Sequence, residues 1–234
     1  MHLVDRLKIY LFHKEKVRRW KGLNHKVQGW SSHEEQQVRF KAIANNVEFQ
    51  GKRVLDLGCG LGELYDYLSD NQCPGFYLGL DQHWPFLRQA RKRIGSSQCR
   101  FKFTDISQAN LPKMDIVVAS GSLSYRTKNP DYLTEMITRM FSACREVTVF
   151  NLLNIEAFPD QTILQAYNKQ EVLAFCQTVT PNVTLIDDYS DADFTLVLKK
   201  HKREHYELSL RDWLIWSLNK SAIGILFIKK RLCL

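Results

Sequence analysis

The fold of this chain is decided by one stretch, R-V-L-D-L-G-C-G-L-G-E-L-Y-D-Y-L, residues 53–68. It begins as an apolar run, continues with glycines at every second position, and ends in the spacing of a helix. Glycines at such a junction let the backbone turn sharply and let a ligand approach it closely. The stretch therefore predicts a β-strand that runs into a ligand-binding loop and then into a helix.

Further short apolar runs, rich in branched residues, alternate with helical patterns along the chain. This alternation is typical of βαβ units and predicts a mostly parallel sheet covered by helices on both faces. Three residues separate the last two runs, too few for a parallel crossover, so these runs must pair antiparallel. The sequence thus predicts an α/β fold with a doubly wound, seven-stranded, mostly parallel sheet and an antiparallel final strand. The expected strands are 54–57, 76–80, 99–103, 115–120, 146–150, 183–189 and 193–199, and the expected helices between them are 61–70, 84–94, 130–143 and 169–178.

The segments that flank this region are predicted to be helical. Residues 3–20 have the pattern of a basic amphipathic helix, and a second helix is expected to begin at Ser32, which forms a capping box with Glu35. The expected division is a helical N-terminal extension or lid at 1–49, a ligand-binding domain at 50–200 and a basic amphipathic helical tail at 201–234. The apolar positions of the first helix are Leu3, Leu7, Tyr10 and Leu11.

The net charge of +8 is concentrated at the two ends of the chain. Residues 1–26 carry eight basic and two acidic side chains, residues 199–234 carry nine and three, and the region between them has a net charge of −4. A polyanion or anionic surface should therefore meet the ends. Three partners remain open for them: the domain or a second copy of it, an anionic membrane surface, and nucleic acid. The last is less favoured because interleaved aromatic residues and a known RNA module are missing.

The apolar stretch near the C-terminus, 213–228, is interrupted by Lys220 and is shorter than the roughly 20 residues that a bilayer span needs. Tryptophans at one end and basic residues at the other are typical of a helix that lies in the membrane interface. The N-terminus lacks the apolar core of a signal peptide. The expected location is therefore cytoplasmic, with a peripheral position at the membrane as an alternative. The six cysteines are scattered without a C-x-x-C pair, so no metal site is expected.

The charges around the glycine loop distinguish two classes of cofactor. In the dinucleotide fingerprint G-x-G-x-x-G the third glycine would fall at Glu63, and Asp56 precedes the loop. Carboxylates beside a pyrophosphate would oppose its binding at a helix N-terminus. The same carboxylates suit a ligand with a positively charged amino group and sulfonium. S-adenosylmethionine carries both groups, so it is the expected cofactor.

The next strand ends carry residues suited to the other parts of this ligand. Asp81 ends the second strand, 19 residues after Gly62, where an acidic side chain can accept both ribose hydroxyls. Asp105 and the backbone N–H of Ile106 follow the third strand, within reach of an adenine ring. The fourth strand ends in A-S-G-S, close to the expected position of the methyl group.

The motifs D-L-G-C-G-L-G, G-L-D, T-D-I and D-I-V-V-A-S together resemble motif I and its successors in class I S-adenosylmethionine-dependent methyltransferases. The resemblance covers about residues 50–200, and G-W-S-S-H-E-E-Q-Q-V-R-F is similar to small bacterial members of unassigned substrate. It implies a Rossmann-like methyltransferase fold and S-adenosylmethionine as cofactor. In the glycine loop, the implied contacts with the methionine part are Asp56, Gly58, Gly60 and Gly62, and Cys59 would contribute its backbone. Asp81 would hold the ribose, with Gln82 as a further contact. Asp105 and Ile106 would hold the adenine, and Ser120 would form the floor of the transfer site.

No catalytic residue can be assigned from the sequence. N-P-D-Y at 129–132 lies nine residues after Ser120 and is better explained as a helix start capped by Asn129. The expected function is methyl transfer to a small-molecule or lipid-like acceptor; the alternatives are an RNA methyltransferase and a non-catalytic S-adenosylmethionine-binding partner subunit. Residues that could face the acceptor are Tyr125, Asn151 and Asn154 and, from a lid, His25, Trp30, His33, Gln37 and Arg39.

Overall fold

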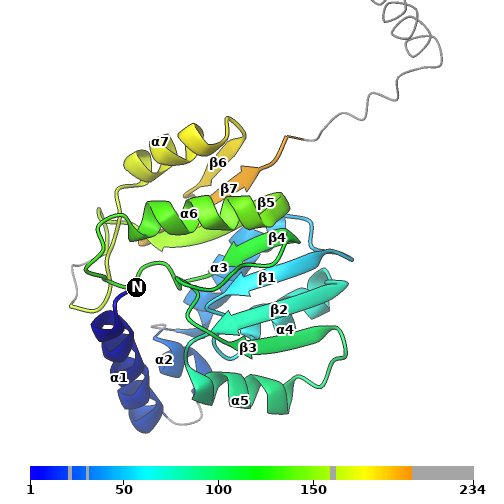
Figure 1. The fold of residues 1–234 in the computed structure, drawn as a ribbon, viewed down its shortest axis with the longest axis vertical. Helices are drawn as coiled ribbons and strands as arrows, with labels where there is room; N and C mark the ends of the chain where they lie inside the picture. The colour runs from blue at the N-terminus through cyan, green and yellow to red at the C-terminus, as the bar shows by residue number, and fades with distance from the viewer. Residues whose placement is uncertain (21–22, 30–31, 159–161, 202–234) are drawn as a thin grey trace, which may run out of the picture. The chain divides into compact units, whose positions relative to one another are not determined.

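The computed structural model describes residues 1–20, 23–29, 32–158 and 162–201, and the expected tail lies outside them apart from His201. Seven strands form one sheet in the order β3-β2-β1-β4-β5-β7-β6 (Figure 1). Within this sheet β7 runs antiparallel to β5 and β6, and the other neighbours pair parallel. The predicted doubly wound sheet is therefore confirmed. Its strands are β1 (Arg53–Leu57), β2 (Phe76–Asp81), β3 (Cys99–Phe103), β4 (Met114–Ala119), β5 (Cys144–Leu153), β6 (Val183–Ile186) and β7 (Asp193–Lys199).

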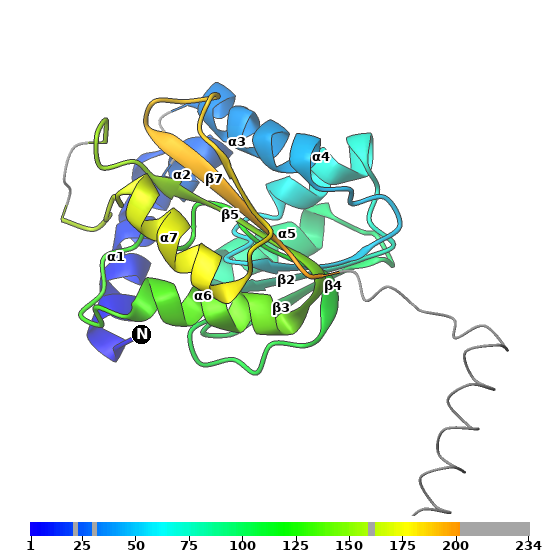
Figure 2. The same ribbon diagram turned by 90° about the horizontal axis from the view of Figure 1, so that it is seen from above.

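Helices cover both faces of the sheet. Figure 2 shows α3 and α4 on one side of it and α6 and α7 on the other. Apolar residues of α6 and α7 form one core cluster with the sheet, and those of α3, α4 and α5 form a second. The helices are α1 (Leu3–Arg19), α2 (Asn24–Gln28), α3 (His33–Asn46), α4 (Glu63–Asn71), α5 (Trp84–Arg93), α6 (Tyr132–Ala143) and α7 (Lys169–Val179).

The alternation of side chains along β1 decides which residues face which layer. Leu55 and Leu57 belong to the core cluster under α6 and α7, whereas Val54 belongs to the cluster under α3, α4 and α5. Asp56 therefore points to the same layer as Val54. This direction matters for the ligand-binding loop that follows β1.

Three details of the helices can be compared with the sequence prediction. The oxygen of Ser32 accepts from the backbone N–H of Glu35 at 3.1 Å, so the predicted N-cap is confirmed. Helix α6 begins after Asp131, whose side chain makes no capping hydrogen bond, and not after Asn129 as predicted. The Asn129 side chain accepts from the Asp131 N–H at 3.0 Å in the turn before the helix. The short helix α2 was not expected. Among the described residues no helix is long and apolar enough to cross a bilayer.

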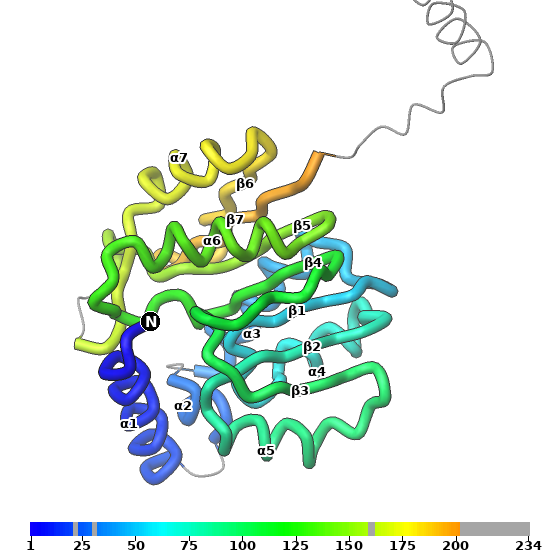
Figure 3. Tube along the Cα trace, in the orientation of Figure 1, coloured from blue at the N-terminus to red at the C-terminus, as the bar shows by residue number. Residues whose placement is uncertain are grey.

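The N-terminal helices pack beside α5. Val27 of α2 forms a small buried cluster with Leu61 and Phe86, and Val17 and Trp20 pack against it from α1 and the turn that follows. Figure 3 traces α1 and α2 lying beside one another near the start of α5. Residues Met1–His201 form one compact unit, so α1 is part of the structure that builds the site.

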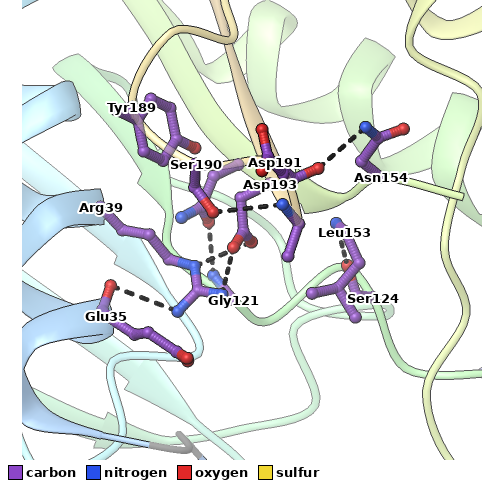
Figure 4. A network of polar contacts seen from close by, with 12 residues as sticks. Glu35, Arg39, Gly121, Ser124, Leu153, Asn154, Tyr189, Ser190, Asp191 and Asp193 are labelled. Carbon is purple, nitrogen blue, oxygen red and sulfur yellow. Dashed lines mark hydrogen bonds and ion pairs between the residues drawn. The ribbon is translucent and has the colours of Figure 1, made fainter. Parts of the chain in front are cut away.

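A buried ion pair joins α3 to the last strand (Figure 4). The Nε of Arg39 donates to Asp193 Oδ1 at 2.8 Å, and its Nη2 donates to Asp193 Oδ2. Both residues are buried, with exposed fractions of 5% and 4%. Arg39 was expected as a lid residue facing the acceptor, and this expectation is wrong because its guanidinium is held by Asp193.

Replacing Arg39 by methionine should lower the free energy of unfolding by about 3 kcal/mol or more, because it leaves the Asp193 carboxylate buried without its partner. The double variant Arg39→Met/Asp193→Leu should recover most of this loss, since no isolated charge remains. Urea unfolding followed by circular dichroism measures both. Lys169→Met, which breaks the exposed pair of Lys169 with Asp187, serves as the control and should change little. Equal losses in the single and double variants would show that the pair itself is not the cause.

Candidate functional site

A cavity of ≈ 340 Å³ lies where β1, β2, β3 and β4 end, and α1 forms one of its walls. Ligands of open parallel sheets bind at this place, where the strand order reverses between β1 and β4. Seven of the ten site residues expected from the sequence line it. They are Gly58, Gly60, Asp81, Gln82, Asp105, Ile106 and Ser120, and their contacts with a ligand remain predictions.

Asp81 connects the end of β2 with the glycine loop. Its Oδ2 accepts from the backbone N–H of Gly60 at 2.8 Å, and its Oδ1 accepts from that of His83 at 2.6 Å. Burial raises the pKa of this carboxyl to about 6, although the hydrogen bonds from the backbone oppose the shift. At neutral pH Asp81 thus supplies one negative charge to the cavity and holds the loop in place.

A side chain would be strained at two glycines of the loop. A Cβ at Gly58 would lie 2.3 Å from Ser122 Cβ, and one at Gly60 would lie 2.1 Å from Gln28 Oε1. Both residues also have positive φ angles, of 79° and 54°, which side chains disfavour. Their backbone therefore forms the wall of the cavity directly, as a close-fitting ligand requires.

The other three expected loop residues do not line the cavity. Asp56 is 1% exposed and accepts from the hydroxyl of Tyr77 on the opposite layer, as the alternation of β1 dictates. Burial raises its pKa to about 7. Cys59 is buried in the same core cluster as Tyr77, and a Cβ at Gly62 would meet the ring of Phe101 at 2.8 Å. None of the three is part of the lining, so the contacts predicted for Asp56, the Cys59 backbone and Gly62 with the cofactor stay predictions.

The carboxylates that face the cavity are not Asp56 and Glu63, the two that the sequence analysis placed beside the cofactor. Glu63 lies to one side, where its Oε2 accepts from Gln28 Nε2 at 2.5 Å and Gln36 Nε2 at 2.7 Å. Asp81 and Asp105 are the acidic residues that line the cavity. A carboxylate-lined site is still present, but it is formed by the ends of β2 and β3.

Helix α1 closes the cavity over these two strand ends. Arg6 donates from Nε to Gln82 Oε1 at 3.2 Å, and its Nη1 lies 3.4 Å from Asp105 Oδ2. Asp5 accepts from Thr127 Oγ1 and from the backbone N–H of Lys128, both at 3.0 Å. In the structure the N-terminal segment contributes to the cavity wall mainly through α1, together with Gln28 of α2, and its role as a lid stays a prediction.

The remaining lid candidates that the structure describes are not part of the cavity lining. The rings of His25 and His33 face each other with centroids 6.1 Å apart, and neither residue is part of the lining. Gln37 is also outside the lining, and Trp30 lies outside the described residues. Of the candidates after β4 and β5, Tyr125 lines the cavity, whereas Asn151 and Asn154 do not.

His13 of α1 forms a buried pair with Tyr125. The His13 Nδ1 lies 3.3 Å from the Val27 carbonyl, which can only accept, so Nδ1 carries the proton. Its Nε2 is then the acceptor for the Tyr125 hydroxyl at 2.7 Å. Burial lowers the pKa of His13 to about 4 and raises that of Tyr125, so at neutral pH the imidazole is unprotonated and the phenol is intact.

The sequence reasoning missed His13. The signal that could have found it is a stripe at four-residue intervals, Asp5, Ile9 and His13, on the helix face opposite the leucines. These three are the residues that α1 buries. Ile9 and His13 both line the cavity.

Several polar atoms of the lining have no partner within the described protein. They are the Ser120 hydroxyl, the Tyr132 hydroxyl and both ring nitrogens of His83. Buried polar atoms are normally hydrogen-bonded, so these are available to a ligand. A buried carboxylate, a side-chain-free loop and unused hydrogen-bonding atoms fit a nucleoside-bearing cofactor of the expected kind, and the cavity volume falls in the usual range for such sites.

The comparisons with known proteins agree with this geometry. Residues 55–148 match the family model described as a methyltransferase domain. The tRNA U34 carboxymethyltransferase of Ectopseudomonas mendocina is 31% identical over 104 residues, 42% of this chain and 32% of that protein. Rv1506c of Mycobacterium tuberculosis, a candidate methyltransferase, is 28% identical over 155 residues, 62% of this chain and 91% of its own length. The chain thus spans about a third of the first relative and nine-tenths of the second.

Solved structures show the same fold. The magnesium protoporphyrin IX methyltransferase of Synechocystis PCC 6803 with bound SAH has a TM-score of 0.61 and 14% identity, with 84% of this chain and 98% of that chain covered. A TehB-like SAM-dependent methyltransferase of Corynebacterium glutamicum has a TM-score of 0.57 and 17% identity, covering 81% and 99%. At this identity the likeness concerns the fold alone.

Proposed function

We propose that this chain, a class I S-adenosylmethionine-dependent methyltransferase by its fold and its matched domain, methylates a small, largely apolar or lipid-like acceptor that carries an ionisable proton. Its cofactor, S-adenosylmethionine, supplies a methyl group on a positively charged sulfur. The observation that carries the proposal for the acceptor is the buried His13–Tyr125 pair in the cavity wall.

We assign the residues of the cavity to two groups, one that would bind the cofactor and one that would bind the acceptor. Asp81 and Gln82 would hold the ribose of the cofactor, Asp105 and Ile106 the adenine, and the backbone of the glycine loop the methionine part. The rest of the lining supports an apolar acceptor, because it consists mostly of aromatic and aliphatic side chains with few polar groups. The members that support this are Ile9, Tyr10, Phe86, Tyr125 and Tyr132.

The His13–Tyr125 pair can remove a proton from the acceptor. When an acceptor hydroxyl oxygen forms its bond to the methyl carbon, the bond from that carbon to sulfur would break and leave its electron pair on the sulfur. The oxygen would become positively charged, so its own proton would become strongly acidic. That proton can pass to the Tyr125 oxygen while the Tyr125 proton passes to His13 Nε2. Even a weak base suffices at this stage, and the lowered pKa of His13 keeps it unprotonated throughout the physiological range.

Two measurements test the function. Calorimetry should show binding of S-adenosylmethionine and none of NAD. The protein should then transfer label from methyl-labelled S-adenosylmethionine to the chloroform-soluble part of a cell extract. Label in tRNA instead would establish the RNA alternative. Cofactor binding with no labelled product in the lipid, metabolite or tRNA fraction would establish a non-catalytic binding protein and refute the proposal.

A further inference from the structure

Helix α1 is oriented against the usual rule for amphipathic helices. It buries Asp5, Ile9 and His13, whereas its leucines are exposed. A helix at a protein surface normally directs its apolar stripe to the core and its polar face to water. The exposed apolar residues are Leu3 (77%), Val4 (50%), Leu7 (54%) and Leu11 (51%), and we call them the leucine face.

The inverted orientation is held by specific polar contacts. Asp5 is bound by Thr127 and Lys128, Arg6 by Gln82 and Asp105, and His13 by Tyr125. Turning the helix to bury its leucines would break all of these contacts. The exposure of the leucine face is therefore a consequence of how α1 completes the cavity. Four neighbouring exposed apolar side chains on one helix mark an interaction surface.

Basic side chains surround the leucine face. Leu3–Arg19 contains six basic and two acidic residues, a net charge of +4. Arg6 is turned toward the cavity, but most of the other cations are exposed beside the leucines. Exposed cations near an anionic leaflet contribute about 1 kcal/mol each at low screening. The exposed basic residues are Lys8, Lys14, Arg18 and Arg19.

We propose that α1 docks on the surface of an anionic phospholipid bilayer, with the leucine face inserted at the boundary between headgroups and acyl chains and the basic residues contacting lipid phosphates. An apolar face flanked by cations is the pattern of interfacial helices. Charge decides against the other occupants. A second copy would bring two helices of charge +4 together, and residues 202–234, with seven basic and three acidic residues, have the same sign.

The position of the cavity gives this docking a consequence for the acceptor. Leu3, Leu7 and Tyr10 are exposed and also line the cavity, so the cavity opens beside the leucine face. With α1 on the bilayer, this opening lies at the lipid surface. A lipid-like acceptor can then enter from the membrane. The docking itself rests on the surface of α1 and holds whatever the acceptor is.

Flotation of the full-length protein with lipid vesicles tests the proposal. The protein should bind vesicles of phosphatidylcholine mixed with phosphatidylglycerol and should bind those of phosphatidylcholine alone only weakly, with binding that weakens as salt is added. The double variant Val4→Ser/Leu11→Ser should lower the partition coefficient about ten-fold, because each change removes an inserted apolar side chain. Neither residue lines the cavity, so cofactor binding and the melting temperature should stay unchanged.

Ile155→Ser is the matched control, because Ile155 is 57% exposed, follows β5 and is not part of α1. It should bind vesicles like the unchanged protein. Three results would each overturn the proposal: no binding of the unchanged protein, equal binding of the double variant, or a dimer in solution that the double variant converts to a monomer. The last would show that a second copy covers the leucine face.

Discussion

Replacing Asp81 by alanine should weaken the binding of S-adenosylmethionine about 100-fold or more. Two effects add. The change removes the charged acceptor proposed for the ribose hydroxyls, and hydrogen bonds to charged groups contribute about 1.5–3 kcal/mol each. It also removes the partner of the Gly60 and His83 N–H groups, so the loop loses its link to β2. Calorimetry of the purified variant measures the affinity.

Two further variants separate these effects. Asp81→Asn keeps an oxygen acceptor and the shape of the side chain, so it should lose less affinity than alanine. Asp70→Ala removes an exposed carboxylate of α4 outside the cavity and should have no effect. An affinity of Asp81→Ala equal to that of the unchanged protein would remove Asp81 from the cofactor site.

The same carboxyl predicts a pH dependence of cofactor binding. Its pKa in the ligand-free protein is raised to about 6, so the carboxyl becomes protonated and neutral as the pH falls below that value. The neutral acid is a weaker partner for the hydroxyls and for a cationic ligand. Affinity should therefore be constant above pH 7 and decline as the pH falls through 6. In Asp81→Asn this decline should disappear.

Removing either member of the His13–Tyr125 pair should lower kcat about 100-fold, within the range that general base catalysis contributes. His13→Gln removes the base that takes the proton, and Tyr125→Phe removes the hydroxyl that links His13 to the molecule being methylated. Because the two act as one path, the double variant should be hardly slower than either single variant. Cofactor affinity should stay unchanged, since the pair is proposed to serve the acceptor.

The protonation state of His13 provides a second readout that needs no acceptor. With a pKa near 4, His13 should remain neutral between pH 8 and 5, with its proton on Nδ1, and nitrogen NMR chemical shifts can show this. On this account kcat at saturating cofactor should stay level down to about pH 5 instead of falling near 6.5. His25→Gln, outside the cavity, is the control. If His13→Gln kept full activity, the His13–Tyr125 pair would have a structural role and no role in proton transfer.

Much of the sheet could be predicted because its signals are local. The period of two in the strands, the period near 3.6 in the helices and the glycine loop between Leu57 and Glu63 each depend on neighbouring residues. The short connection between the last two strands was enough to predict their antiparallel pairing. The strand-end positions of Asp81, Asp105 and Ser120 followed from this order, because parallel strands end on the same edge of the sheet.

The direction of individual side chains could not be predicted with the same success. Asp56 was expected at the ligand, but the pleat of β1 turns it to Tyr77. The apolar positions of α1 left open whether that side packs on the domain, and the structure buries Asp5 and His13 instead. In both cases the periodicity identified the element correctly and left open which of its faces the protein would use.

The sequence by itself therefore determined the order of the elements, the kind of sheet and the edge at which a cofactor can bind, since these follow from patterns among adjacent residues. Only the tertiary structure decided which groups meet inside the cavity. His13 reaches Tyr125 across 112 residues, and Arg39 reaches Asp193 across 154. Such contacts depend on how finished elements pack against one another, and no local pattern in the chain records that packing.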